Sequence, residues 1–323
     1  MNSSASAPEP PLFLVGIPRA GTTWTARVLS NEDSLYPVME PDNDARSAPA
    51  IWAKRRVGRF PILRPGDRED DVQRLWAWAL AGAPQTTRLK VAARILRLTR
   101  PSGRRRFYQG KTSVVMQVAG LVGANPPIRP VPGLSDRRLF VKTVLLPLAV
   151  EWLAAETNAD VLILLRHPGN VLSSWMKLDL NLEYTRLDDH PAIRRQIEQK
   201  QIPRPGSDPL ERMVWHIGVL DAGLEAAAAR HPTWQVRTHE DLCIEPIDKF
   251  KRLFEDLGLV WNERVEQYLA RNDRPGEGFL TRRVASDQPA AWKQRLTPAQ
   301  IEVLQRVLSQ FSLSTWKEED LVP

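Results

Sequence analysis

The sequence predicts an α/β protein with a P-loop-like, three-layer fold, in which helices flank a central parallel sheet. Short, wholly apolar segments of strand length alternate along the chain with longer segments of helical periodicity. Strands that are apolar on both faces belong in a parallel sheet that is covered on both sides. The first such strand also leads through a glycine-containing turn into a helical segment, which is the order found in phosphate-binding loops.

Four segments have the length and composition of buried strands. They are Leu12 to Val15, Leu139 to Val141, Val161 to Leu165 and a shorter one near Val236. Parallel strands need a crossover between them, so helices are expected in the intervening segments. In open sheets of this kind, ligands bind at the carboxyl ends of the strands.

Six segments between and after these strands have helical periodicity. They are Thr22 to Leu29, Pro147 to Thr157, Asn170 to Lys177, Glu211 to Arg230, Pro246 to Leu257 and Pro298 to Phe311. No strongly biased linker divides the 323 residues. We therefore expect a disordered tail over residues 1–10 and a single domain over residues 11–323.

The chain carries a formal net charge of +7, which favours anionic partners. Between Arg88 and Arg106 it holds eight lysine and arginine residues and no acidic residue. This stretch would suit a nucleic-acid-binding protein. The apolar residues Val91, Ile95 and Leu98 instead favour an amphipathic helix that packs on the core and holds its cations in water. We expect no nucleic-acid partner.

Cysteine content and hydropathy indicate the compartment. A single cysteine, Cys243, excludes an intrachain disulfide and a cysteine-based metal cluster, and it suits a reducing environment. The first ten residues lack the features of a secretory signal, and the longest apolar stretches are too short to cross a membrane. We expect a cytoplasmic protein without a membrane partner. The oligomeric state is left open.

The turn after the first strand resembles a nucleotide P-loop with one substitution. Gly16 and Gly21 have the spacing of G-x-x-x-x-G-K-[ST], but Thr22 stands at the lysine position. Such a loop directs backbone N–H groups and a helix N-terminus at a phosphate, and here Arg19 supplies a cation from within the loop. The alternative is a helix that is capped by Thr22 or Thr23 after a tight glycine turn.

A second candidate phosphate site follows the strand that ends at Leu165. Arg166 comes directly after this strand, and Ser174 lies two helical turns further on. An arginine fork with a hydroxyl suits a phosphate dianion. The alternative is an arginine in a salt bridge and a serine on a helix surface.

In this order, the two segments resemble the sulfotransferases that use 3′-phosphoadenosine 5′-phosphosulfate (PAPS). The residues from Arg19 to Trp24 are similar to the family's 5′-phosphosulfate loop, P-K/R-x-G-T-T-W. Those from Arg166 to Ser174 are similar to its 3′-phosphate motif, R-x-P-x-x-x-x-x-S. Three further matches follow the family's order: Lys142-Thr143, Thr238 to Leu242 with His239 at a tyrosine position, and Trp292-Lys293 with Leu296-Thr297.

The departures from the pattern indicate a branch of the family. Val144 stands where cytosolic aryl and steroid sulfotransferases have a catalytic histidine. Arg282 and Arg283 are approximate matches to the family's late nucleotide-covering loop. Glu40 lies where carbohydrate sulfotransferases have a glutamate that is the base in some of them. The chain therefore resembles the carbohydrate-type and bacterial branches more than the aryl type.

The resemblance implies a single sulfotransferase domain that moves a sulfuryl group from PAPS to a hydroxyl of a small-molecule or glycan acceptor, with no metal. It implies catalytic roles for Glu40, Arg19 and Lys142, with Glu151 and His190 as weaker candidates for the base. The residues implied to hold the nucleotide are Arg19, Ala20, Gly21, Thr22, Thr23, Trp24, Arg166, Ser174, His239, Arg282 and Arg283, with Trp24 and His239 on either side of the adenine.

One rival reading is a P-loop kinase or NTPase, which the missing lysine at position 22 disfavours. The acceptor itself is not determined by the sequence. Among the eleven tryptophans, we expect Trp52, Trp76, Trp78 and Trp175 to be candidates for stacking on a sugar at the mouth of the site.

Overall fold

A computed structural model describes residues 9–97, 114–180, 185, 187–275, 284–316 and 320. Within these residues, five parallel strands form one sheet in the order β2-β3-β1-β4-β5. The strands are β1 (Leu12–Gly16), β2 (Leu35–Met39), β3 (Arg138–Thr143), β4 (Asp160–Leu165) and β5 (Gln235–Thr238). The predicted α/β class with a central parallel sheet is confirmed. Residues 1–8 of the expected N-terminal tail lie outside the described residues.

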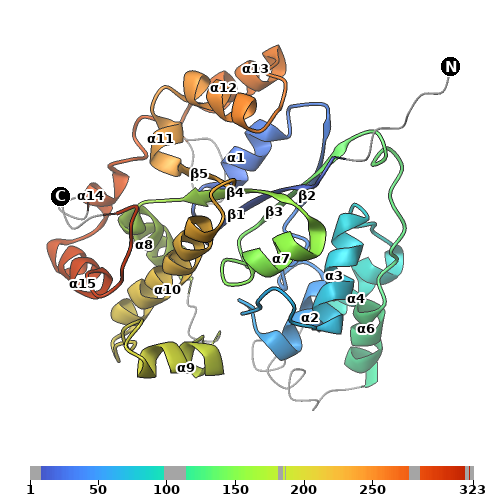
Figure 1. Cartoon of the computed structure of the whole chain (residues 1–323), viewed down its shortest axis with the longest axis horizontal. Helices are drawn as coiled ribbons and strands as arrows, with labels where there is room; N and C mark the ends of the chain where they lie inside the picture. Colours follow the sequence, from blue (N-terminus) through green and yellow to red (C-terminus); the bar gives the residue numbers. More distant parts are fainter. Residues whose placement is uncertain are drawn as a thin grey trace.

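Helices cover both faces of the sheet (Figure 1). One face carries α1 (Thr22–Leu29), α11 (His239–Cys243), α12 (Pro246–Asp256) and α13 (Glu263–Asn272). The other face carries α2 (Ala48–Val57), α3 (Asp70–Leu80), α4 (Thr87–Arg97), α6 (Val114–Ala124), α7 (Val150–Thr157), α8 (Pro168–Lys177) and α10 (Pro209–Arg230). Beyond α8 and α10 lie α9 (Pro191–Glu198), α14 (Ala291–Arg295) and α15 (Pro298–Leu308), and η2 (Leu187–Asp189) precedes α9.

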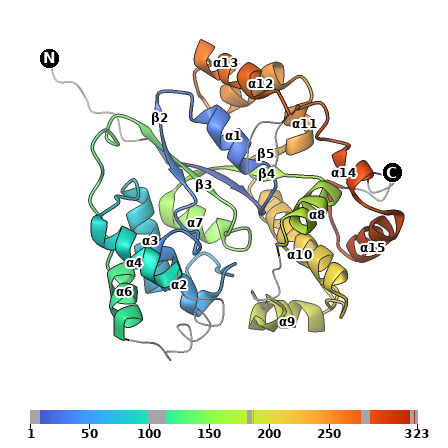
Figure 2. The same cartoon turned by 180° about the vertical axis from the view of Figure 1, so that it is seen from behind.

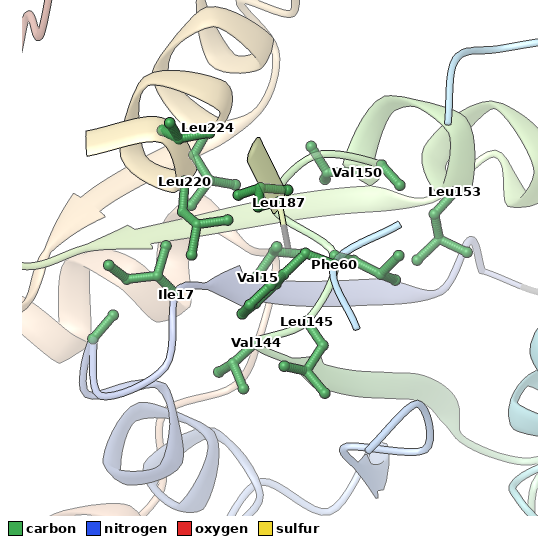
Figure 3. Close-up of a cluster of buried hydrophobic side chains, with 14 of the residues drawn as sticks. Val15, Ile17, Phe60, Val144, Leu145, Val150, Leu153, Leu187, Leu220 and Leu224 are labelled. Carbon is green, nitrogen blue, oxygen red and sulfur yellow. The ribbon is translucent and has the colours of Figure 1, made fainter. Parts of the chain in front are cut away.

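The alternation of side chains along each strand divides the core into two clusters. On β1, Leu12 and Leu14 pack under α1 and α12, whereas Phe13 and Val15 pack toward α7 and α10. Figure 3 shows part of the second cluster, which includes Val15 of β1 and Leu220 of α10. Both faces of the central strands are therefore buried, as the uninterrupted apolar segments predict.

Local sequence signals explain where the helices near the site begin. α8 starts at Pro168, which tolerates the first helical position, and His167 accepts a hydrogen bond from the Gly169 N–H at 3.1 Å. Burial lowers the pKa of His167 to about 4, so its neutral ring keeps this acceptor. α10 starts at Pro209 behind the capping carboxylate of Asp208. The proline and cap place α8 directly after β4, two residues earlier than predicted.

The periodicity of the sequence does not reveal β2, because its segment contains Pro37. β2 lies at the edge of the sheet and pairs with β3 alone, with Pro37 opposite Phe140. An edge strand tolerates a residue that cannot donate a ladder hydrogen bond. The strand was missed for this reason.

The expected amphipathic helix forms as α4 and packs on the core with Arg88, Lys90 and Arg94 exposed, but it buries a different apolar stripe from the predicted one. Val91 is 52% exposed, whereas Leu89, Ala92 and Leu96 are buried. The predicted stripe with Val91 and Ile95 and the buried stripe with Leu89 and Leu96 both have helical spacing. Periodicity cannot show which of two neighbouring apolar stripes on one helix faces the core. Packing against α2 and α6 selects the stripe with the two leucines. Leu98 and the cations beyond Arg97 lie outside the described residues.

No helix among the described residues is long and apolar enough to cross a membrane.

Phe254 tests the core between the sheet and α12. Its ring is fully buried and meets the ring of Trp261 edge to face at 5.2 Å. We expect Phe254→Ala to lower the free energy of unfolding by about 3–5 kcal/mol, because it removes an aromatic ring and leaves a cavity. Urea denaturation measures this. Val260→Ala, at a side chain that is 68% exposed, should change it by less than about 0.5 kcal/mol. Equal losses in the two variants would contradict the assignment of this cluster as core.

Candidate active site

The candidate residues lie at the carboxyl ends of the parallel strands, which together form one edge of the sheet. In sheet order, Glu40 follows β2, Lys142 is near the end of β3, Arg19 follows β1, Arg166 follows β4 and His239 follows β5. The connection from β1 leads toward β2, and the connection from β4 leads toward β5 on the other side. The crevice between β1 and β4 is therefore a topological switch point, the usual ligand site of an open α/β sheet.

The loop after β1 has the geometry of an anion-binding turn. The Ala20 N–H donates to the Ile17 carbonyl at 3.1 Å, and Gly21 then begins α1 with φ 91°. The Ala20 side chain is buried, so only its backbone can meet a ligand. No side chain of the described residues caps α1, and the first N–H groups of a helix have no acceptor within it. These donors and the helix dipole favour an anion beside Thr22 and Thr23.

Gly21 is required at its position for two reasons. Its positive φ is rare for residues with a side chain. A Cβ there would also lie 2.0 Å from Cδ2 of His239. The loop therefore lies in contact with the His239 ring, and no side chain fits between them at position 21.

Arg19 joins the two predicted phosphate segments. Its Nε donates to Oγ of Ser174 at 2.9 Å, and its carbonyl oxygen accepts from Nη1 of Arg166 at 2.9 Å. Trp175 fixes α8 against the same loop, because its Nε1 donates to the Pro18 carbonyl at 2.7 Å. The structure therefore brings the two segments into direct contact.

The electrostatics of Arg166 are those of a buried cation. Its Nε lies 3.9 Å from Oε1 of Glu240 and makes no hydrogen bond within the described part of the chain. Burial lowers the pKa of Arg166 from its ordinary value, while Glu240 acts in the opposite direction. An arginine remains a cation under such a shift. A buried donor without a partner is an exception in folded proteins and fits a group that awaits an anion.

Glu240 and Asn170 form a buried network behind Arg166. Glu240 accepts from the His167 N–H at 3.1 Å and from Nδ2 of Asn170 at 2.9 Å. Asn170 also donates to the Pro289 carbonyl at 3.0 Å and accepts from the Trp292 N–H at 3.1 Å. Sequence reasoning assigned no role to either residue, although Glu240 lies within the match from Thr238 to Leu242. Only the fold reveals that they connect β4, α11 and the segment before α14.

The rings expected to enclose adenine contact each other. Trp24 and His239 meet with centroids 5.5 Å apart and planes at 64°, and Trp24 also packs on Phe250. Burial holds the pKa of His239 well below its ordinary value, so its ring is neutral. In this arrangement the two rings are not parallel planes with a gap for a base. The stacking role stays a prediction that requires one ring to turn.

Glu40 and Lys142 form an ion pair at the other end of the edge. Lys142 donates to Oε1 of Glu40, and Nδ2 of Asn43 donates to Oε2 at 2.6 Å. Burial by itself would raise the pKa of Glu40, but the charge and hydrogen bond of Lys142 hold it below its ordinary value. Burial lowers the pKa of Lys142 in turn, and Glu40 opposes that shift. Asn43 is a partner of Glu40 that sequence reasoning missed.

Asp42 fixes this end of the edge in place. It accepts from Oγ1 of Thr143 at 2.8 Å and pairs with Lys54 of α2 at 3.4 Å, and all three side chains are buried. The Glu40 N–H donates to the Lys142 carbonyl at 2.7 Å, as part of the Met39–Lys142 pairing that ends the β2–β3 register. The backbone thus positions Glu40 beside the lysine.

The other candidate bases are engaged elsewhere. Glu151 accepts from Nη2 of Arg230 at 2.6 Å and pairs with His231, and His190 caps α9. Val144 is buried in the core cluster that Figure 3 shows.

Three of the four tryptophans proposed for sugar stacking were misplaced: Trp76, Trp78 and Trp175 are buried in the core. Their large apolar rings are buried because the space between sheet and helices needs filling. Trp52 is half-buried, and its Nε1 donates to Asp71 at 2.8 Å. Arg282 and Arg283 lie outside the described residues.

Within the described residues, no group of three or more histidine, cysteine, aspartate or glutamate side chains could hold a metal ion.

The geometry of the site does not by itself show which protein family the chain belongs to. Comparison with known families does. The model of the sulfotransferase family matches residues 10–263. The chain belongs to the sulfotransferase family. Membership indicates a transferase enzyme, and the matched segment contains the loop after β1, Glu40, Lys142, Arg166 and His239. No curated protein sequence matches the chain.

Several solved sulfotransferase structures are similar to this one. The sulfotransferase domain from the curacin biosynthetic pathway is 16% identical, with a TM-score of 0.49 over 95% of this chain and 100% of that chain. The sulfotransferase domain of the Synechococcus PCC 7002 olefin synthase is 14% identical, with a TM-score of 0.47 over 95% and 97%. Mouse sulfotransferase SULT7A1 complexed with PAP is 13% identical, with a TM-score of 0.39 over 96% and 87%.

The backbone of Arg19 supplies a test of the loop. Arg19 and Glu40 are both non-glycine residues with positive φ, 73° and 49°. Such strain persists where the surrounding structure or a function holds it. We expect Arg19→Gly to be about 1 kcal/mol more stable than Arg19→Ala, because glycine adopts this φ without a Cβ penalty. Urea denaturation of the two variants measures the difference, and equal stabilities would show that the loop relaxes in solution.

Proposed function

We propose that this sulfotransferase transfers a sulfuryl group from PAPS to a hydroxyl of a small-molecule or carbohydrate-containing acceptor. The observation that carries the proposal is the contact between the Arg19 loop and Arg166 at adjacent strand ends. PAPS is an adenosine with one anionic group on each side of its ribose. A site with two neighbouring cationic loops therefore fits both of its anionic ends.

The two loops divide the donor between them in this proposal. The N-terminus of α1, with Thr22 and Thr23, holds the 5′-phosphosulfate. Arg166 and Ser174 hold the 3′-phosphate, and the unpartnered Nε of Arg166 supports this because it is a donor still to be satisfied. Arg19 then gives up or shares its hydrogen bond to Ser174 when the nucleotide enters. His239, which closes against Gly21, lies where the adenine would follow.

The chemistry is an in-line displacement at sulfur. The acceptor oxygen forms a bond to sulfur as the bond from sulfur to the 5′-phosphate oxygen breaks, and the phosphate keeps the electron pair. Arg19 and Lys142 neutralise the charge that develops on this leaving group, as fixed cations do in phosphoryl transfer. The hydroxyl proton passes to Glu40. Adenosine 3′,5′-bisphosphate and the sulfated acceptor are the products.

The ion pair with Lys142 regulates the basicity of Glu40. Lys142 holds the pKa of Glu40 low, although burial acts in the opposite direction, and a low pKa makes Glu40 a weak base. When donor binding draws Lys142 toward the phosphosulfate, the charge of Lys142 offsets less of the effect of burial on Glu40. The pKa of Glu40 then rises. Proton affinity would then develop only when the donor is present.

The donor assignment is tested by calorimetric titration of the protein with adenosine 3′,5′-bisphosphate. We expect binding without Mg²⁺, and loss of binding in Arg166→Ala and in Arg19→Ala. The same titration with ATP and Mg²⁺ distinguishes a P-loop phosphotransferase. Preference for ATP with Mg²⁺ over the bisphosphate would reject the proposed donor.

Replacing Glu40 tests the base. Glu40→Gln should bind adenosine 3′,5′-bisphosphate as tightly as the unaltered protein, but lower kcat at least about a hundredfold, because it cannot accept the proton. A radiolabelled donor with a panel of hydroxyl acceptors measures turnover. Glu266→Gln, at an exposed position of α13, is the matched control and should leave kcat unchanged. Near-normal turnover in Glu40→Gln would remove the base assignment while leaving the donor site intact.

The Lys142 pair also predicts a pH profile. Because Lys142 holds the pKa of Glu40 below its ordinary value, the acidic limb of kcat/KM in the free enzyme should fall at a pH below that of an ordinary glutamate. In Lys142→Met, burial of Glu40 is no longer opposed by this cation, so the limb should move to higher pH while activity falls. An unchanged limb would show that another group controls it.

A further inference from the structure

The surface formed by α4 and α6 is unusually apolar for a protein exterior. Four large apolar side chains of α6 are exposed: Val114 at 74%, Val115 at 60%, Leu121 at 55% and Val118 at 54%. Val91 of α4 continues the same surface at 52%. Single exposed apolar residues are normal, but a contiguous group marks a surface that meets another apolar phase. Figures 1 and 2 show α4 and α6 side by side at the outer edge of the helices that cover this face of the sheet.

A groove runs between the two helices. It has a volume of about 440 Å³ and is lined by Val91 and Ile95 of α4 together with Val114, Val118 and Val122 of α6. Arg88 is the charged residue in its lining. This groove therefore combines an apolar floor with a cation at its rim.

The sequence segment that contains α4 and α6 carries charge of one sign. From Val72 to Ser135 the sequence contains eleven lysine and arginine residues and no acidic residue. Arg88, Lys90 and Arg94 of α4 are exposed, and none of them forms an ion pair with a described residue. Cations without local counter-charges attract an anionic partner.

We propose that the α4–α6 surface docks on an anionic lipid membrane. Exposed valines and leucine next to arginine and lysine form the pattern of an interfacial membrane-binding element, in which apolar side chains enter the acyl boundary and cations meet lipid phosphates. Nucleic acid would use the cations but not the apolar groove. A second copy of this chain would bring two surfaces of the same positive charge together.

α4 contributes residues both to the docking surface and to a depression near the candidate site. This depression is lined by Arg46 and Ser47 together with Leu89, Lys90 and Ala93, which belong to α4. Arg46 is close enough to Glu40 and Lys142 to affect the pKa of both. Under the proposed sulfotransferase function, on which this step rests, the acceptor is then a hydroxyl carried by a membrane lipid.

This proposal revises the expectation of no membrane partner, which rested on the absence of a spanning segment. A peripheral surface needs only a partly buried apolar patch and a few cations, so hydropathy does not detect it. The expectation that Val91 packs on the core concealed this patch.

Co-sedimentation of the whole protein with vesicles tests the proposal. One set of vesicles is phosphatidylcholine, and the other is an equimolar mixture with phosphatidylglycerol. We expect binding to the anionic set alone, weakened by added NaCl. Val118→Asp and the double variant Arg88→Glu, Lys90→Glu should each lower the partition coefficient by about tenfold or more. Val260→Asp and Arg252→Glu, at exposed positions elsewhere, are matched controls and should bind as the unaltered protein does.

Titration with adenosine 3′,5′-bisphosphate accompanies each variant, because docking variants should leave nucleotide binding unchanged. Failure of the donor site and failure of docking are therefore separate results. Absence of binding to anionic vesicles, or equal binding to both sets, would overturn the proposal. Conversion of a dimer to a monomer by Val118→Asp in light scattering would assign the surface to a second copy. A lower Tm of Val118→Asp with unchanged vesicle binding would show that the chain itself fills the groove.

Discussion

The parallel pairing of β1 with β4 is the constraint on which the candidate site depends. Gly16 lies opposite Leu164, so the loop after β1 and the arginine after β4 leave the sheet side by side. The crossovers from these strands run in opposite directions and open a crevice at that point. The hydrogen bond from Arg166 to the Arg19 carbonyl and the indole of Trp175 then hold both loops at a fixed separation. Without that pairing, the two motifs would be unrelated segments of sequence.

Charge burial is the second feature that shapes this edge. Arg166, Lys142 and Lys54 are all buried, and each has a carboxylate nearby. Buried ions cost more in desolvation than their pairing returns unless hydrogen bonds complete their shells. Behind Arg166, the hydrogen bond from Asn170 helps to complete the shell of Glu240. Asp42 pairs with Lys54 and also accepts a hydrogen bond from Thr143. The strained backbone of Arg19 and Glu40 adds to the energy that the rest of the fold must offset.

The sequence predicted the parts of the fold that depend on local pattern. β1, and β4 from Val161 onward, are apolar, and α8 and α10 have helical periodicity, so the existence and type of these elements could be predicted. Both helices begin at a proline two residues before the predicted start. It missed β2, because Pro37 disguises an edge strand. It chose the wrong face of α4, because two apolar stripes compete on that helix. Trp76, Trp78 and Trp175 were placed at the surface because residue type does not reveal whether an aromatic ring fills the core.

For the site, sequence alone determined which groups are present and which family the chain resembles: a glycine turn with Arg19, an arginine after a strand, and a glutamate after the first helix. Spacing along the chain fixes such motifs because they are local. Only the tertiary structure decided that Lys142 pairs with Glu40, that Glu240 and Asn170 support Arg166, and that His239 meets Gly21. These contacts join residues far apart in the chain. They depend on strand order and helix packing, which follow from the free energy of the whole fold rather than from any local pattern.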